Sequence, residues 1–308
     1  MNQLAAIIGP TGIGKSRLAV RLAAAFNGEV VSADSRQIYR YMDIGTAKPD
    51  SQQMSSVPHH LIDIINPDEN FSLTRFQQLA TKTISSIQRR GRLPVVVGGS
   101  GQYVWALLEG WGVPRVPPNM ELRQRLEKRV AAGEREGLYA ELLARDPEYA
   151  RQIDSRNVRR VIRAIEVSQD KPGSPISRQQ SEPPYKKLII GLTTDREDLY
   201  SLVDRRVDRM IEQGLVEEVQ GLVSRGYGYS LPSMSAIGYR QIGAYLRGEA
   251  TLEADIQQIK FESHRFVRQQ YNWFKLGDSR INWFDIRDPR ALIKINALVE
   301  GFISNNDN

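Results

Sequence analysis

The chain has 308 residues, of which 41% are hydrophobic, and this is enough apolar material for one large core or for a main domain with an insertion. It contains no cysteine, which excludes disulfides, thiolate metal sites and cysteine nucleophiles, and its three histidines argue against a zinc centre. The formal net charge of +6 favours a polyanionic partner, although many basic proteins bind none. There is no apolar run long enough to cross a membrane and no charged-then-apolar leader, so we expect a cytoplasmic protein without a membrane partner.

A glycine-rich segment near the start fits the pattern G-x-x-x-x-G-K-[ST] of a phosphate-binding loop. The apolar run over 4–8 before it predicts a buried strand, and apolar residues at helical spacing over 18–26 follow it. In that setting the glycines let backbone N–H groups turn towards an anion, Lys15 adds a positive charge and Ser16 offers a hydroxyl to Mg²⁺. The sequence therefore predicts polyphosphate binding, with a nucleotide as the default ligand. The loop residues are Gly9, Pro10, Thr11, Gly12, Ile13, Gly14, Lys15 and Ser16.

Two further predicted strands end near this loop and are followed by residues that bear on its function. A buried strand over 28–32 delivers Asp34 just beyond its carboxyl end, where ligands bind in an open parallel sheet. Asp34 is either a catalytic carboxylate or the N-cap of the following turn, a common role for aspartate. A strand over 93–97 opens into Gly98 and Gly99, where a nucleotide hydrolase is expected to carry an aspartate for Mg²⁺. The glycines therefore argue against an ordinary ATPase or GTPase.

The composition of the chain changes between residues 114 and 184. Prolines mark both ends of this charged stretch, and few strong apolar positions lie between them, so we interpret it as a mostly helical insertion domain. The catalytic core then comprises 1–113 and 185–308. Arginines gather over 151–163 at spacings that share one helical face. Both a solvated basic face and a phosphate-contacting strip remain open for this cluster.

The segments between and after these elements complete the expected fold. Residues 42–63 show little periodicity and are interpreted as a loop, whereas 74–90 carry the apolar stripe of an amphipathic helix. Residues 187–192 return as a strand that closes the insertion back onto the sheet. We therefore predict an α/β fold with a P-loop NTPase-like parallel sheet flanked by helices.

The C-terminal part is expected to be mainly helical. A helix over 199–211 carries Arg205 and Arg206, of which only one can point at the site. A last helix over 253–275 interleaves basic residues with aromatics. Such a pattern serves either RNA binding, with charges on phosphates and rings on unstacked bases, or core packing.

Seven blocks of the sequence, in their order along the chain, resemble the bacterial tRNA dimethylallyltransferases, also called tRNA isopentenyltransferases. A phosphate loop is shared by many families, but this series of blocks is not. The blocks are 9–16, 32–39, 43–49, 57–63, 97–103, 157–166 and 237–241.

The resemblance implies a reaction and roles for named residues. The family moves a dimethylallyl group from its diphosphate to N6 of the adenosine immediately 3′ of the tRNA anticodon, and its phosphate loop holds that diphosphate without consuming ATP. By this resemblance 9–16 bind dimethylallyl diphosphate with Mg²⁺ on Ser16, Asp34 is the general base, Ser100 lies near the substrate nucleotide and Arg206 reaches the diphosphate. A monomer is expected. Contacts with the tRNA anticodon stem-loop are implied for Asp34, Ser35, Arg36, Gln37, Ser100, Arg123, Arg159, Arg160, Val161, Ile162, Arg163, Gly238, Tyr239 and Arg240.

The chain departs from the family pattern at several positions, among them Asn272, which stands where the family's Thr-Trp pair has its threonine. Ser100 replaces the usual threonine and keeps a hydroxyl, and Gln102 replaces a leucine. In the last helix Arg268-Gln269-Gln270 resembles the family's Lys-Arg-Gln, so one arginine of that motif is lost at Gln269.

Three rival functions stay open on the sequence alone. A small-molecule kinase would use Lys15 to hold ATP and Asp34 to activate a hydroxyl, but it explains neither Gly98 and Gly99 nor the basic insertion. A prenyltransferase for free adenine nucleotides would not need that insertion. A non-catalytic RNA-binding protein would leave the phosphate loop unexplained.

Overall fold

The computed structural model describes residues 2–112, 116–170, 183 and 185–304. The chain divides into two compact units, of which the first comprises Met1–Leu108 with Pro183–Asn308 and the second Glu109–Glu182. The sequence places the corresponding boundaries at 113/114 and 184/185, and the prolines on which it relies at 114, 172, 175 and 184 lie outside the described residues. Each unit is described by itself.

The first unit is built on a six-stranded sheet in the order β3-β2-β4-β1-β5-β6, and every neighbouring pair of strands is parallel. Its inner strands are buried on both faces, as their continuous apolar runs predict. The strand with the phosphate loop at its end therefore lies in the middle of the sheet. The strands are β1 (Gln3–Ile8), β2 (Gly28–Ser32), β3 (His59–His60), β4 (Leu93–Val97), β5 (Lys186–Thr193) and β6 (Ile281–Asp285).

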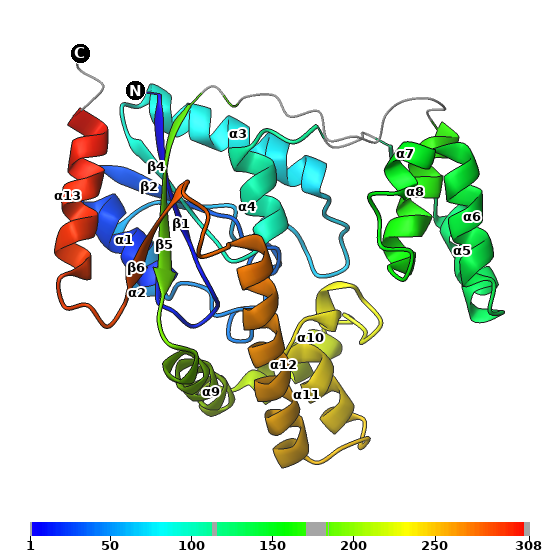
Figure 1. The fold of residues 1–308 in the computed structure, drawn as a ribbon. Coiled ribbons are helices and arrows are strands. Elements are labelled where there is room, and N and C mark those ends of the chain that lie inside the picture. Colours follow the sequence, from blue (N-terminus) through cyan, green and yellow to red (C-terminus); the bar gives the residue numbers. More distant parts are fainter. Residues whose placement is uncertain (1, 113–115, 171–182, 184, 305–308) are drawn as a thin grey trace. The chain divides into compact units, whose positions relative to one another are not determined.

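Helices cover both faces of this sheet. α1 (Lys15–Ala25) and α13 (Ala291–Ser304) lie on one side, and α3 (Leu73–Arg89) and α4 (Gly101–Leu108) on the other (Figure 1). Leu22 of α1 and Val299 of α13 are fully buried in one core cluster with the strands. On the other side Phe76 is fully buried and stacks on Tyr103, with ring centroids 4.2 Å apart. These layers confirm the predicted fold class.

A second core of this unit lies under the helices that follow β5. It joins the chain after β2, including Ile38 and Met42, to apolar side chains of the C-terminal helices. The packing therefore brings residues from the two ends of the unit together at the carboxyl edge of the sheet. The helices are α9 (Arg196–Glu212), α10 (Leu215–Ser224), the 3₁₀ turn η1 (Ser233–Ser235), α11 (Tyr239–Leu246) and α12 (Leu252–Trp273).

The second unit is helical and has a core of its own. Its apolar side chains come from all four helices and include Leu126, Leu142 and Ile165. This agrees with the helical character predicted for the insertion. The helices are α5 (Met120–Ala131), α6 (Arg135–Arg145), α7 (Pro147–Ala150) and α8 (Val158–Asp170).

The interpretation of 42–63 as loop alone is wrong. This segment contains α2 (Ser51–Ser56), which Asp50 begins by accepting a bond from the Gln53 backbone N–H, and the two-residue strand β3. Both elements are too short to show a period in the sequence. Among the described residues, no helix is long and apolar enough to span a membrane.

Phe76 and Phe261 allow a matched test of this packing. Phe76 is fully buried, whereas Phe261 of α12 is 60% exposed. We expect Phe76→Ala to lower the free energy of unfolding by about 3–5 kcal/mol, because it leaves a cavity under the sheet. Phe261→Ala should change it by no more than about 0.5 kcal/mol. Urea unfolding followed by circular dichroism measures both, and equal losses would contradict the layer assignment.

Candidate active site

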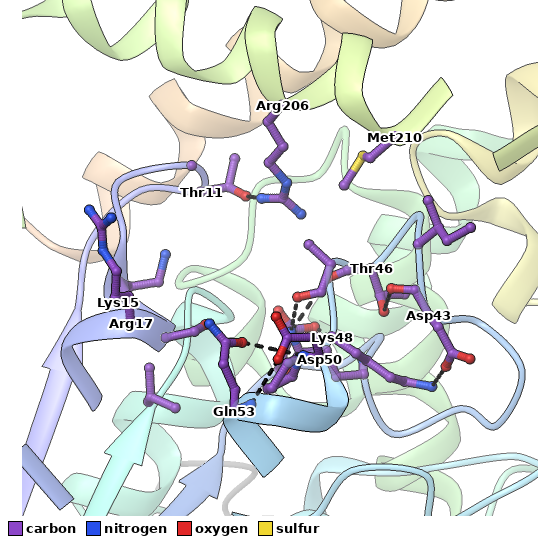
Figure 2. Close-up of a pocket in the computed structure, with 18 of the residues that line it drawn as sticks. Thr11, Lys15, Arg17, Asp43, Thr46, Lys48, Asp50, Gln53, Arg206 and Met210 are labelled. Atoms are coloured by element: carbon purple, nitrogen blue, oxygen red, sulfur yellow. Dashed lines mark hydrogen bonds and ion pairs between the residues drawn. The ribbon is translucent and has the colours of Figure 1, made fainter. Parts of the chain in front are cut away.

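A cavity of about 790 Å³ lies at the carboxyl ends of β1, β2 and β4. The phosphate loop forms one wall, and the segment 43–54 with Asp63 forms the facing wall. Figure 2 shows Arg206 and Met210 extending into this space from α9, with Thr11 and Lys15 on one side and Thr46 and Lys48 on another. Ligands of parallel α/β sheets bind at this edge.

The phosphate loop has the backbone that its glycines predict. Gly9, Gly12 and Gly14 have φ angles of 137°, 81° and 98°, which side chains rarely permit. A Cβ at Gly9 would also lie 2.5 Å from the Leu192 carbonyl oxygen of the neighbouring strand. Helix α1 begins at Lys15, so its free N–H groups and partial positive charge face the cavity.

Lys15 is held inside the loop and is easily deprotonated. Its Nζ donates to the Pro10 carbonyl oxygen at 2.7 Å. Burial and then the nearby Arg206 lower the pKa of Lys15 from 10.5 to about 7, and the Asp34 carboxylate opposes this shift. An anion bound in the loop would therefore restore the charge of Lys15.

Arg206 reaches the loop from α9. Its guanidinium group donates to the Thr11 hydroxyl, and its Nε is buried without a hydrogen-bond partner among the described atoms. Burial lowers the pKa of Arg206 and Asp34 opposes this, but an arginine stays charged in proteins. A buried cation with a free donor is suited to binding an anionic ligand.

Asp34 lines the cavity just beyond β2 and also caps the turn that follows it. Its Oδ1 accepts from the backbone N–H groups of Arg36 at 2.8 Å and Gln37 at 3.4 Å. Ser100 supports this turn from the end of β4, since its hydroxyl accepts from the Ser35 N–H at 3.1 Å. The capping bonds leave Oδ2 for a ligand, so the two roles considered for Asp34 are compatible.

The end of β4 explains why two glycines stand where a hydrolase has an acid. A Cβ at Gly98 would lie 2.3 Å from the Ala33 carbonyl oxygen, and one at Gly99 would lie 2.3 Å from Gln270 Nε2. Gln270 of α12 accepts from the Thr11 N–H at 2.8 Å and donates to the Gly99 carbonyl at 2.9 Å. The sequence leaves this helix open between RNA binding and core packing, and it does not show the contact of Gln270 with the phosphate loop.

A lysine and a glutamate fix the facing wall of the cavity. Lys48 Nζ donates to the Tyr39 carbonyl and the Asp43 carboxylate, both at 2.6 Å, and to the Asp63 carboxylate at 2.5 Å. Glu218 of α10 accepts from three successive backbone N–H groups at 2.7–3.1 Å and from the Tyr239 hydroxyl at 2.5 Å. Those three groups belong to Asp43, Ile44 and Gly45.

Several residues with an implied RNA contact are engaged in the first unit itself. Arg36 donates to the Pro232 carbonyl at 2.9 Å, and Gln37 is buried and donates to the Ala47 carbonyl at 3.2 Å. Tyr239 is fully buried, and its hydroxyl donates to the Glu218 carboxylate.

The other two residues of that block lie at the start of α11. Gly238 precedes the helix with φ 95°, and Arg240 is exposed beside Glu262. Arg240 is therefore the member of this block whose side chain is open to a partner.

The remaining residues with an implied RNA contact lie in the second unit, and they differ in exposure. Arg159 and Arg160 of α8 are exposed, whereas Val161 and Ile162 are 2% and 4% exposed and pack in the core. The side chains of these two apolar residues therefore pack the core of the second unit.

Arg123 and Arg163 both donate to the buried carboxylate of Glu166, Arg123 at 2.8 Å. The ion pairs hold the pKa of Glu166 below its usual value although burial raises it. This carboxylate ties α5 to α8.

Ser16 lines the cavity, as a magnesium-binding hydroxyl must. The described residues contain no group of three or more histidines and carboxylates that could hold a metal ion by themselves. This donor set fits Mg²⁺ bound chiefly by ligand phosphates with one protein hydroxyl, because Mg²⁺ commonly keeps waters and phosphate oxygens.

Comparisons with known proteins agree with this geometry. The model of the family described as IPP transferase matches residues 37–277. The tRNA dimethylallyltransferase of Chloroflexus aurantiacus is 53% identical over 280 residues, which are 89% of this chain and 93% of the relative. The chain belongs to the IPP transferase family. The tRNA dimethylallyltransferase of Dehalococcoides mccartyi is 46% identical over 303 residues, or 98% of this chain and 93% of the relative.

Solved structures of the IPP transferase family share the fold. The tRNA isopentenylpyrophosphate transferase of Bacillus halodurans is similar over 100% of this chain and 98% of its own, with a TM-score of 0.74 and 40% identity. A eukaryotic dimethylallyltransferase acting on tRNA is similar over 99% and 80%, with a TM-score of 0.81 and 26% identity. These likenesses confirm the resemblance seen in the sequence and do not favour the kinase alternative.

The pKa of Lys15 predicts proton uptake on anion binding. At about pH 8 the free lysine is mostly neutral, and a bound anion raises its pKa again. Near pH 8 we expect Lys15 to take up about one proton when pyrophosphate binds. Near pH 6 we expect no proton uptake by Lys15, because it is already charged. Calorimetry in buffers of different ionisation enthalpy measures the uptake.

The Lys15→Arg variant is the control, because its side chain is charged at every pH used. Equal proton uptake by variant and parent would contradict the lowered pKa. In the ligand-free protein the same group makes the free energy of unfolding rise between pH 7 and 10.5, since the unfolded chain binds the proton that folded Lys15 has lost.

Glu218 and Glu217 test the facing wall. Glu218→Ala leaves three backbone N–H groups and the Tyr239 hydroxyl without their acceptor, so we expect a loss of about 2–4 kcal/mol in the free energy of unfolding. Faster proteolytic cleavage within 43–48 should accompany it. Glu217→Ala, on the exposed side of α10, should leave both nearly unchanged. Similar cleavage rates for the two variants would show that Glu218 does not order this segment.

Proposed function

We propose that this protein transfers the dimethylallyl group of dimethylallyl diphosphate to N6 of the adenosine immediately 3′ of the anticodon in tRNA. The observation that carries the proposal is one cavity that combines a phosphate loop, two buried cations and the Asp34 carboxylate just beyond β2, in a chain of the IPP transferase family. Relatives at about half identity are named tRNA dimethylallyltransferase. The product is N6-(dimethylallyl)adenosine with pyrophosphate.

In the transfer one bond forms as another breaks. The N6 lone pair attacks C1 of the dimethylallyl group, and the C1–O bond breaks with its electron pair going to the diphosphate. The attacking nitrogen becomes cationic, so its proton turns acidic and passes to a carboxylate within hydrogen-bond reach. Asp34 supplies that carboxylate through Oδ2, because Oδ1 is occupied by the turn.

The leaving diphosphate collects negative charge, and the loop is suited to stabilising it. Lys15, Arg206 and the N–H groups at the start of α1 surround the position that the loop offers to phosphates. Their fixed orientation means that little reorganisation is needed during the reaction. When bound, Mg²⁺ would be held by Ser16 and would neutralise further phosphate charge.

The acceptor adenosine has to leave its stack to bring N6 to Asp34. Anticodon loops make this step inexpensive because their bases are already single-stranded. We assign phosphate contacts to the exposed Arg159 and Arg160 of the second unit and to Arg240 of the first. The reacting groups named above lie in one cavity of a single chain, which supports action as a monomer. A tRNA substrate supports a cytoplasmic location.

The experiment that tests the proposal needs no ATP. Protein is incubated with radiolabelled dimethylallyl diphosphate, Mg²⁺ and unmodified tRNA whose anticodon ends in adenosine, and label in the RNA is counted. Label on the adenosine beside the anticodon supports the proposal. Transfer only to free adenine nucleotides, or ATP hydrolysis with a small acceptor and no labelled RNA, would replace it by one of the rival functions.

Asp34→Asn separates the chemical role of this residue from its structural one. The amide oxygen can still accept the bonds from the turn, but the group cannot remove a proton. We expect kcat to fall by roughly 10² to 10⁴ while the Kd for tRNA stays within a few fold. Single-turnover transfer and filter binding measure the two. An unchanged kcat would remove Asp34 from the mechanism.

A further inference from the structure

One side chain of α12 bonds to the phosphate loop, although the loop itself lies between β1 and α1. Gln270 uses its amide oxygen to accept from the Thr11 N–H at 2.8 Å and its amide nitrogen to donate to the Gly99 carbonyl at 2.9 Å. It is only 3% exposed, so water does not compete for these bonds. The amide therefore links the loop after β1 to the end of β4.

Both partners of Gln270 lie where the backbone of the cavity wall has little room to move. Thr11 is held twice, because its hydroxyl accepts from Arg206 of α9 while its N–H donates to α12. Gly99 leaves the space that the amide fills, and a Cβ there would lie 2.3 Å from Gln270 Nε2 and 3.6 Å from Lys15 Nζ. The shape of the loop thus depends on a residue far from it in the sequence.

We infer that Gln270 is a positioning residue for the diphosphate, which acts by fixing the phosphate loop through Thr11 and Gly99. The inference rests on the proposed function, since it assigns the loop to dimethylallyl diphosphate. It assigns Gln270 to the diphosphate side of the reaction and not to RNA contact.

The chemistry of the amide explains the choice of residue. A methionine fills a similar volume but leaves a buried N–H and a buried carbonyl without partners. A glutamate still accepts from Thr11, but it loses the donor for Gly99 and puts a negative charge beside the bound phosphates. Glutamine alone of these three satisfies both groups and stays neutral.

The first test compares Gln270→Met with Gln269→Met, which alters the exposed neighbour on the same helix. Calorimetry gives the Kd for pyrophosphate, and steady-state kinetics give KM for dimethylallyl diphosphate and for tRNA. In Gln270→Met we expect the pyrophosphate Kd and the diphosphate KM to rise about tenfold or more, with KM for tRNA within about twofold. Gln269→Met should leave the pyrophosphate Kd at the parent value.

Gln270→Glu adds a readout that a merely structural role would not move. When the new carboxyl is protonated, it donates to Gly99 and accepts from Thr11 as the amide does. The ratio of the variant's pyrophosphate Kd to that of the parent should therefore be larger near pH 8 than near pH 6. Measuring the ratio cancels the protonation of pyrophosphate itself.

The outcomes separate this inference from the function on which it rests. A parent protein that does not bind pyrophosphate overturns the proposed function and this inference with it. A parent that binds pyrophosphate and labels tRNA, while Gln270→Met has the same Kd and KM, overturns the inference alone. If Gln270→Met does not fold, a Kd ratio for Gln270→Glu that stays near one at both pH values overturns it.

Discussion

Two like charges that face each other in one cavity set the main constraint on this structure. Burial, and then repulsion by Arg206, lowers the pKa of Lys15 to about 7. The fold holds both in place through backbone and hydroxyl acceptors of the loop itself, Pro10 for Lys15 and Thr11 for Arg206. A bound anion would offset this repulsion and favour the charged form of Lys15, so the cavity is suited to anionic ligands.

Two C-terminal helices each use one polar side chain to bond to the backbone of an N-terminal loop. On α12 the amide of Gln270 bonds to the phosphate loop, and on α10 the carboxylate of Glu218 bonds to three backbone N–H groups of the facing wall. Each uses one polar side chain to satisfy main-chain groups that irregular segments leave unpaired. The two walls of the cavity thus have rigid supports, while each wall itself is irregular backbone.

Local patterns in the sequence were sufficient for the centre of the site and not for its supports. The phosphate loop, Asp34 and the glycines after β4 were predicted because strand, turn and helix signals lie next to one another in the chain. Glu218 could not be found, because nothing near it in the sequence shows that it accepts bonds from residues 43–45. The burial of the Val161 and Tyr239 side chains could not be predicted, because a shared block identifies positions but not which of its side chains face the core.

The order of the strands has a consequence for synthesis on the ribosome. β1 pairs with β4 on one side and with β5 on the other, and Gln3 lies opposite Lys186, so the entire second unit is made before the sheet can close. Until then β1 is an apolar edge strand with a row of unpaired backbone groups, which is the kind of surface that aggregates. The second unit has its own core and can become compact during this interval. Chaperone demand should therefore be greatest between the emergence of β1 and that of β5.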